Sequence, residues 1–89
     1  MNRVVVLMST YNGEKYIRTQ IDSILSQKEC ELTLLVRDDG STDETKNILN
    51  EYQERNQLTW YSGENLKPPS SFMDLVFQAP DGDYYAFAD

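Results

Sequence analysis

The order of the apolar segments predicts an α/β fold with a parallel sheet. Apolar runs that are typical of strands alternate with stretches in which apolar residues recur at helical spacing, in the order β-α-β-α-β-α-β. Such alternation is typical of a parallel sheet with right-handed crossovers and helices on both faces. The sequence has no internal repeat, and its 89 residues suffice for one small domain, residues 1–89.

The first half of the sequence predicts two strands and two helices. Residues 4–7 and 32–36 are continuous apolar runs of the kind that buried parallel strands carry. A helix is expected from about residue 14 to 27, because one apolar stripe has the spacing i, i+4, i+7, i+8. That stripe consists of Ile17, Ile21, Ile24 and Leu25.

The second helix has both a start signal and an apolar face. Ser41 is expected as its N-cap, and Glu44 three residues later completes a capping box. The apolar face has the spacing i, i+3, i+4, i+7. It consists of Thr45, Ile48, Leu49 and Tyr52.

The second half of the sequence repeats the pattern more weakly. Residues 58–62 are expected as a third strand, and residues 63–71 as a loop because they contain Gly, Asn and paired prolines. A third helical stripe consists of Phe72, Leu75, Val76 and Ala79. After a turn at residues 79–83, a fourth strand begins at residues 84–88, where we expect Tyr85 and Phe87 to have different environments rather than to form an aromatic site.

Composition excludes several classes of function. A net charge of −7 argues against a nucleic-acid partner, because phosphate backbones are bound by clustered Lys and Arg. The chain has no His and a single Cys, Cys30, which excludes a zinc site, a His-activated nucleophile and an internal disulfide. The absence of a disulfide suits a reducing cytoplasm. No apolar run approaches the roughly 20 residues of a membrane span, and the N-terminus has no secretory signal.

Polar clusters follow three of the predicted strands. In open parallel sheets, ligands bind beyond the carboxyl ends of the strands. The clusters at those ends are residues 8–13, residues 38–42 and Asp89. Without His or paired Cys, a bound metal would need carboxylate ligands and would be a hard ion such as Mg²⁺, Mn²⁺ or Ca²⁺.

Two adjacent carboxylates, Asp38 and Asp39, end the second strand. Successive residues of an extended chain point in opposite directions, so one carboxylate could cap loop amides while the other faces the crevice. A crevice carboxylate could accept a hydrogen bond from a pyrimidine or guanine base, or from a ribose hydroxyl. The alternative is a plain turn in which Asp39 only favours the start of the next helix.

The segment after the first strand carries the stronger signal for a ligand. Tyr11 could stack on a base, while the hydroxyls of Ser9 and Thr10 bind its edge or the phosphates. Asn12 is expected as the N-cap of the first helix, and Asn12-Gly13 allows a positive φ. No Gly-x-Gly-x-x-Gly motif or P-loop lysine is present, so a divalent ion on carboxylates, with Asp89 as the candidate ligand, is the expected counter-charge for a diphosphate.

The chain resembles the opening of family 2 glycosyltransferases, the inverting GT-A enzymes that use nucleotide sugars. The resemblance is carried by "VVVLMSTYNGEKYIRTQIDSILSQ" at residues 4–27 and "LLVRDDGSTDET" at residues 34–45. Residues 64–89, "ENLKPPSSFMDLVFQAPDGDYYAFAD", are similar to the next stretch in the rhamnosyltransferase-like branch. Together, these segments extend the resemblance over essentially the whole chain.

The resemblance implies a Rossmann-like parallel sheet of the GT-A type with strand order 3-2-1-4, here truncated. It also implies a role for each site residue. Ser9, Thr10 and Tyr11 would line the nucleotide pocket, with Tyr11 against the base. Asp39 would accept a hydrogen bond from the base, and Asp38 would support the loop. Asp89 would be the first carboxylate of the Asp-x-Asp segment that holds Mn²⁺ or Mg²⁺.

The activity implied is transfer of a sugar from a UDP-, dTDP- or GDP-linked donor to a glycan or lipid-linked acceptor. No catalytic residue is assigned, because the general base is expected beyond residue 89, so this chain alone is expected to be inactive. The open edge at residues 84–88 predicts self-association or marginal stability of this chain. The location implied is cytoplasmic, with the inner face of the membrane left open for a longer protein. A non-enzymatic nucleotide-binding or regulatory module is the alternative function.

Overall fold

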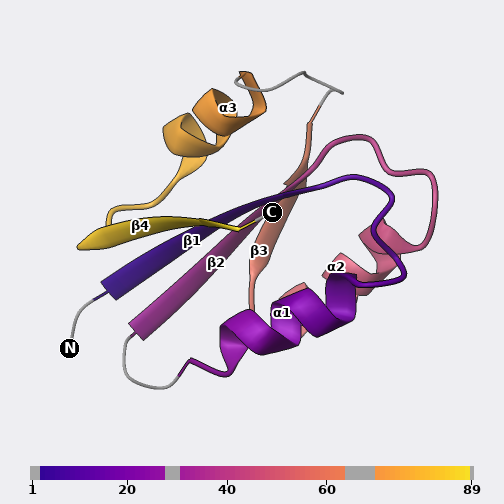
Figure 1. Ribbon diagram of the computed structural model, residues 1–89, viewed down its shortest axis with the longest axis horizontal. Helices are drawn as coiled ribbons and strands as arrows, with labels where there is room; N and C mark the ends of the chain where they lie inside the picture. The colour runs from indigo at the N-terminus through magenta and orange to yellow at the C-terminus, as the bar shows by residue number, and fades with distance from the viewer. Residues whose placement is uncertain (1–2, 28–30, 64–69, 89) are drawn as a thin grey trace.

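A computed structural model describes residues 3–27, 31–63 and 70–88. Strands β1 (Arg3–Thr10), β2 (Glu31–Asp38), β3 (Thr59–Ser62) and β4 (Tyr84–Ala88) form one parallel sheet in the order β3-β2-β1-β4 (Figure 1). Helices α1 (Ile17–Leu25), α2 (Thr45–Glu54) and α3 (Ser70–Gln78) connect them. The predicted α/β class and strand order 3-2-1-4 are confirmed.

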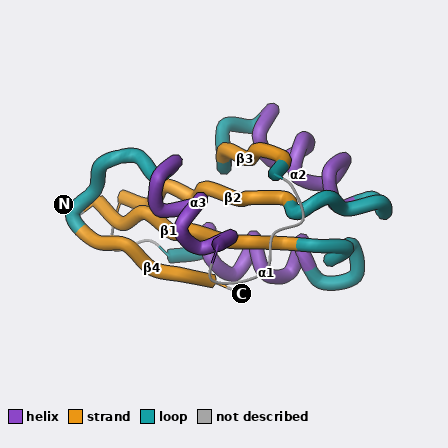
Figure 2. Tube along the Cα trace, turned by 90° about the horizontal axis from the view of Figure 1, so that it is seen from above, coloured by secondary structure: helices purple, strands orange, loops and turns teal. Residues whose placement is uncertain are grey.

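The helices form one layer on each side of the sheet. Helices α1 and α2 cover one face and α3 covers the other (Figures 1 and 2). Alternate residues of β1 face the two layers, as the period of a strand requires. Val6 and Met8 pack with α1 and α2, whereas Val5 and Leu7 pack with Leu75 of α3. Two apolar cores, one on each face, therefore hold the sheet.

Both helices that follow the first two strands begin later than the sequence suggests. The carbonyl of Gly13 accepts hydrogen bonds from the N–H groups of Tyr16 and Ile17 at 3.0 and 2.8 Å, so residues 14–16 form a turn and α1 begins at Ile17. The predicted stripe nevertheless faces the core, because Ile17 and Ile21 are buried. The face predicted for α2 is confirmed in full, since all of its members are buried.

The capping box predicted at Ser41 and Glu44 is wrong. Helix α2 begins at Thr45, and the residue before it, Glu44, makes no side-chain cap. Instead, the carboxylate of Asp43 accepts hydrogen bonds from the backbone N–H of Thr45 at 2.9 Å and from its hydroxyl at 2.5 Å. The hydroxyl of Ser41 is used elsewhere, as a donor to Asp38.

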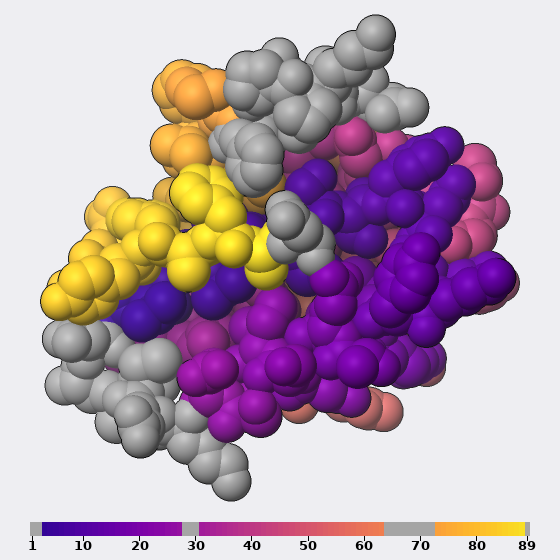
Figure 3. All heavy atoms as spheres, in the orientation of Figure 1, coloured from indigo at the N-terminus to yellow at the C-terminus, as the bar shows by residue number. Residues whose placement is uncertain are grey.

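Strand β4 and helix α3 leave an apolar surface beside the sheet. Leu75 is buried as predicted, but Val76 is 48% exposed, and the side chain of Phe72 lies outside the described part of the structure. Tyr85 and Phe87 were expected to differ in environment, yet both line one cavity of about 370 Å³, because residues i and i+2 of a strand point the same way. Figure 3 shows the side chains of β4 at the surface.

No helix within the described residues is both long enough and apolar enough to cross a membrane.

Candidate functional site

The carboxyl ends of β1 and β2 lie next to each other. Thr10 at the end of β1 pairs with Asp38 at the end of β2, and the backbone N–H of Asp39 donates to the carbonyl of Thr10 at 2.9 Å. The loops that follow the two strands run side by side on the right of Figure 1, and Figure 2 shows the same pairing from above. The two predicted polar clusters therefore meet at one edge of the sheet.

Hydrogen bonds between the two loops lock them together. The backbone N–H groups of Asn12 and Gly13 donate to the hydroxyls of Ser41 and Thr45, at 2.8 and 2.9 Å. In return, the side-chain oxygen of Asn12 accepts from the N–H of Thr42 at 2.8 Å. Asn12 has a φ of 48°, as the Asn-Gly pair suggested, but it is not the N-cap of α1. It bridges to the second loop instead.

Asp43 extends this contact to the start of α2. Its carboxylate accepts a hydrogen bond from the backbone N–H of Glu14 at 3.2 Å, in addition to those from Thr45. Desolvation raises the pKa of Asp43, but the hydrogen bonds from Thr45 and Glu14 outweigh it and hold that pKa below its usual value. Asp43 therefore serves as an ionised acceptor for both loops.

The two adjacent carboxylates point to opposite faces of the sheet, as predicted. The side chain of Asp38 has 0% exposure and accepts from the N–H and the hydroxyl of Ser41 at 3.0 and 2.6 Å. Because it is fully enclosed, Asp38 supports the loop and is out of reach of a ligand. Asp39 points to the α3 side, where it retains 8% exposure and pairs with Arg37.

Arg37 and its partners form a charged network that the sequence analysis did not identify. The guanidinium donates to Asp39 at 2.5 Å and to Asp74 of α3 at 2.9 Å. The hydroxyl of Tyr61 on β3 also donates to Asp74, at 2.7 Å. An arginine between an apolar run and two carboxylates was the available signal, but its partner on α3 is distant in sequence.

The end of β1 and the loop that follows it line a shallow cavity. Ser9, Thr10 and Tyr11 surround a volume of about 200 Å³ together with Gly13, Tyr16 and Gln20. Tyr11 is 54% exposed, so its ring is accessible for stacking. In the described part of the chain, Asp38 and Asp39 are not among the residues that line this cavity. The predicted site residues are thus adjacent along one edge, but they do not share one enclosed pocket.

The candidate metal ligand cannot be placed. Asp89 lies outside the described residues. Among residues 3–27, 31–63 and 70–88, no group of three or more His, Cys, Asp or Glu side chains is arranged to hold a metal ion. The described residues therefore do not form a metal site by themselves.

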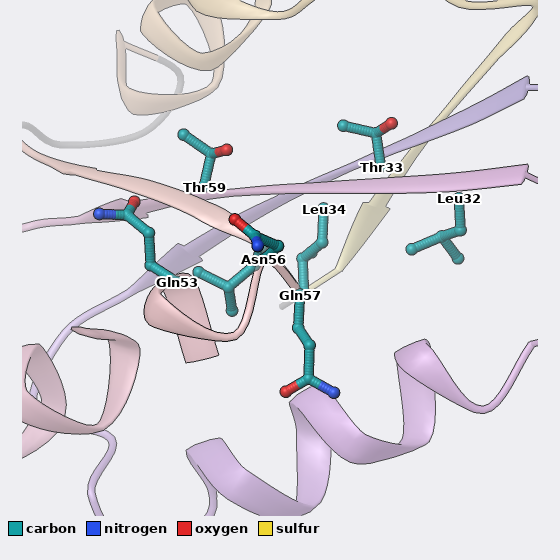
Figure 4. Close-up of a pocket in the computed structure, with 8 residues that line it drawn as sticks. Leu32, Thr33, Leu34, Gln53, Asn56, Gln57 and Thr59 are labelled. Atoms are coloured by element: carbon teal, nitrogen blue, oxygen red, sulfur yellow. The ribbon is translucent and has the colours of Figure 1, made fainter. Parts of the chain in front are cut away.

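A separate cavity lies at the opposite edge of the sheet. It measures about 350 Å³ and is formed by the start of β2 with residues that lead from α2 into β3 (Figure 4). Gln53, Asn56 and Gln57 supply its polar groups. Because it lies at the amino ends of the strands, it is remote from the two locked loops and is not part of the candidate site.

The fold is that of an open parallel α/β domain, a class in which ligands bind at the carboxyl ends of the strands, where the two polar loops lie. Residues 5–89 match the domain described as Glycosyl transferase family 2. The chain belongs to this family.

Named relatives agree with this assignment. The chain is 48% identical over 61 residues to the dTDP-rhamnosyl transferase RfbG of Shigella flexneri, and the aligned region covers 68% of this chain and 20% of RfbG. It is 31% identical over 96 residues to the poly(ribitol-phosphate) beta-N-acetylglucosaminyltransferase TarS of Staphylococcus aureus, covering 100% of this chain and 16% of TarS. The chain thus spans about a fifth or less of the length of these relatives.

Solved structures give the same result for the fold. A crystal structure of S. aureus TarS superposes with a TM-score of 0.80 at 28% identity, over 98% of this chain and 16% of the other. A TarS structure in complex with UDP gives a TM-score of 0.77 at 27% identity, over 98% of this chain and 27% of the other.

Proposed function

We propose that this chain forms the donor-nucleotide part of an inverting glycosyltransferase. The enzyme would transfer a sugar from a UDP-, dTDP- or GDP-linked donor to a glycan or lipid-linked acceptor in the cytoplasm. Membership of family 2 supports this, as do relatives named rhamnosyl and N-acetylglucosaminyl transferases. A related TarS structure holds UDP, which supports a nucleoside diphosphate as part of the donor.

One observation supports this function most: two loops with nucleotide-binding chemistry are locked together at the carboxyl edge of the sheet. The exposed ring of Tyr11 offers a stacking surface, and base–aromatic stacking contributes about 1–3 kcal/mol. The carboxylate of Asp39 can accept a hydrogen bond from a base N–H. Ser9 and Thr10 offer hydroxyls for the base edge or the phosphates.

Charge balance supports a metal-assisted donor. The chain has a net charge of −7, so it offers few cations to offset the charge of a diphosphate. A divalent cation, Mn²⁺ or Mg²⁺, bound with Asp89 as a ligand would neutralise the diphosphate as it departs. Tyr11 and Asp39 would bind the nucleobase, Asp38 would support the loop, and the ion would bind the phosphates.

The transfer step needs a general base, and no residue of this chain is assigned that role. In an inverting transfer, a general base deprotonates the acceptor hydroxyl, which attacks the anomeric carbon while the diphosphate leaves from the opposite face. We propose that the base lies beyond residue 89. The 89-residue chain alone would then bind the donor nucleotide without transferring the sugar.

Nucleotide binding and sugar transfer by the natural full-length polypeptide test this proposal. We expect micromolar or tighter binding of UDP, dTDP or GDP with Mn²⁺. Asp39→Ala should weaken that binding about tenfold or more, because a hydrogen bond to a charged group contributes about 1.5–3 kcal/mol. Asp81→Ala, which removes a carboxylate from the turn before β4, is the matched control and should bind like the wild type.

Two results would contradict the proposal. Absence of affinity for all three diphosphates would exclude a donor-nucleotide site, and equal affinities of the Asp39→Ala variant and the wild type would exclude the assigned role of Asp39. Binding without transfer to any acceptor would instead favour a non-enzymatic nucleotide-binding module.

We also propose that the isolated 89-residue chain self-associates through β4. Among the described strands, β4 pairs only with β1, and its Tyr84 and Phe87 side chains are 58% and 53% exposed. An open, apolar edge strand is a template for pairing with a second copy. Sedimentation should show a concentration-dependent mass that Tyr84→Lys reduces, whereas Tyr16→Lys, in the turn before α1, should not reduce it. A monomer at high concentration with a cooperative melt would contradict this.

A further inference from the structure

Arg37 is a buried charged residue on the face of the sheet that packs against α3. Its neighbours on that face include the apolar side chains of Leu35 and Leu7, and its own side chain is only 1% exposed. An unpaired cation in such a place costs several kcal/mol of desolvation, so a buried arginine requires carboxylate partners. Those partners come from two places: Asp39 on the candidate site and Asp74 on helix α3.

The partners hold the guanidinium in one orientation. Its Nη1 donates to Oδ1 of Asp39 at 2.5 Å, and its Nε donates to Oδ2 of Asp74 at 2.9 Å. The same Oδ2 accepts from Tyr61 at 2.7 Å. Hydrogen bonds from Tyr61 and Arg37 hold the pKa of Asp74 below its usual value, while burial and the bond to Asp74 raise the pKa of Tyr61. Asp74 is therefore an anion between two donors.

A glycine confines the guanidinium from a further side. A Cβ at Gly63 would lie 2.5 Å from Cζ and 2.7 Å from Nε of Arg37, well inside van der Waals contact. The backbone N–H of Gly63 donates to the carbonyl of Asp38 at 2.8 Å, which fixes the glycine against the end of β2. The planar cation thus occupies a slot built from β2, β3 and α3.

We infer that Arg37 is the positioning residue for the carboxylate that reads the nucleobase, and that Asp74 anchors Arg37 to helix α3. This inference rests on the proposed donor-nucleotide function. Arg37 fixes one oxygen of Asp39, and so fixes the direction in which the carboxylate meets a ligand. A carboxylate that is ion-paired with arginine is ionised, and an ionised carboxylate only accepts hydrogen bonds. The site therefore selects bases that present a ring N–H, namely uracil, thymine or guanine, over cytosine, whose ring N3 is an acceptor.

Nucleotide discrimination by the natural full-length polypeptide tests this inference. The probes are the tightest binder among UDP, dTDP and GDP, and CDP as the base that lacks the ring N–H, each titrated by calorimetry. The wild type should prefer the first probe over CDP by about tenfold or more. Arg37→Met and Asp74→Asn should reduce that preference about tenfold, and Arg37→Lys should retain part of it. Arg18→Met, which removes the exposed ion pair with Glu51, is the matched control and should leave it unchanged.

The ratio of two affinities separates positioning from damage. A preference that is unchanged in both Arg37→Met and Asp74→Asn would overturn the inference, and so would an equal loss of both affinities. Asp74→Asn keeps the inference testable if Arg37→Met does not fold, because Asp74 lies on a partly exposed side of the network. If the wild type binds none of the diphosphates, the proposed function fails. A wild type that binds but does not discriminate overturns the inference alone.

Discussion

Replacing Gly63 by alanine should destabilise the protein by moving Arg37. The added Cβ would lie 2.5 Å from Cζ of Arg37, and ordinary carbon contacts are roughly 3.5 Å, so the guanidinium must shift by about 1 Å. A shift of that size would lengthen its bond to Asp39, which measures 2.5 Å, to the limit of hydrogen bonding, and its bond to Asp74, which measures 2.9 Å, beyond that limit.

The expected cost follows from those two bonds. A hydrogen bond to a charged group contributes about 1.5–3 kcal/mol, and overpacking of a filled site typically costs about 1–3 kcal/mol. We therefore expect Gly63→Ala to lower the free energy of unfolding by about 3 kcal/mol, measured by urea denaturation. No strain of the glycine backbone enters this value, since Gly63 is not among the residues with a positive φ.

A double-mutant cycle with Asp74→Asn tests the mechanism as well as the magnitude. If Gly63→Ala acts by separating Arg37 from its partners, the double variant should be about 1 kcal/mol or more less destabilised than the two single variants predict by addition. Additive losses, or a Gly63→Ala variant as stable as the wild type, would refute the reasoning. Gly82→Ala is no substitute control, because it would collide with Val5.

Three further predictions concern the loops and the network. Asp38→Asn should lower the free energy of unfolding by about 2–3 kcal/mol in urea denaturation, because a buried amide cannot accept both donors of Ser41. Asn12→Ala should cost about 2 kcal/mol and Asn12→Gly only about 1, since glycine tolerates the φ of 48° and both variants lose the bond from Thr42; equal losses would contradict this. The pKa of Asp74 is lowered in the folded state, so its contribution is present above the unfolded pKa of about 4 and is lost as pH falls through the folded pKa. The urea concentration at the unfolding midpoint should therefore decrease as the pH is lowered below about 4, and it should decrease less steeply in Asp74→Asn. The same dependence on pH in the wild type and in Asp74→Asn would contradict a stabilising role for the Asp74 carboxylate.

The elements of the fold were predictable because burial imposes a period on the sequence. The stripes of α1 and α2 each reflect one buried face, and the continuous apolar runs of β1 and β2 reflect burial on both faces of the sheet, so the existence and order of these elements follow from local patterns. The strand ends did not follow. β1 extends to Thr10 and β2 to Asp38, beyond the apolar residues, because polar residues take part in the backbone ladder as readily as apolar ones.

The loop details were predicted wrongly where distant contacts replaced local ones. Ser41 and Asn12 are typical N-cap residues, and each was assigned to the helix that follows it. In the structure their side chains join the two loops across separations of 29 and 30 residues. Such a contact has no signature in a single local window, so capping rules alone could not identify it.

The site was predictable as a location and only partly as a mechanism. The opposite directions of Asp38 and Asp39 follow from strand geometry, and the structure has that arrangement. The environment of Asp39 could not be deduced, because it depends on Arg37 being buried against Asp74, 37 residues further along the chain. An arginine between an apolar run and two carboxylates is therefore a useful signal in similar sequences.

The most direct test of the central claim is a crystal structure of the natural full-length polypeptide with its preferred nucleoside diphosphate and Mn²⁺. The distance to measure joins the ring N–H of the base to the nearest carboxylate oxygen of Asp39. We predict about 2.8–3.0 Å, with the ring of Tyr11 against the base. A base bound elsewhere, for example in the cavity formed by Gln53, Asn56 and Gln57 at the opposite edge of the sheet, would contradict the account.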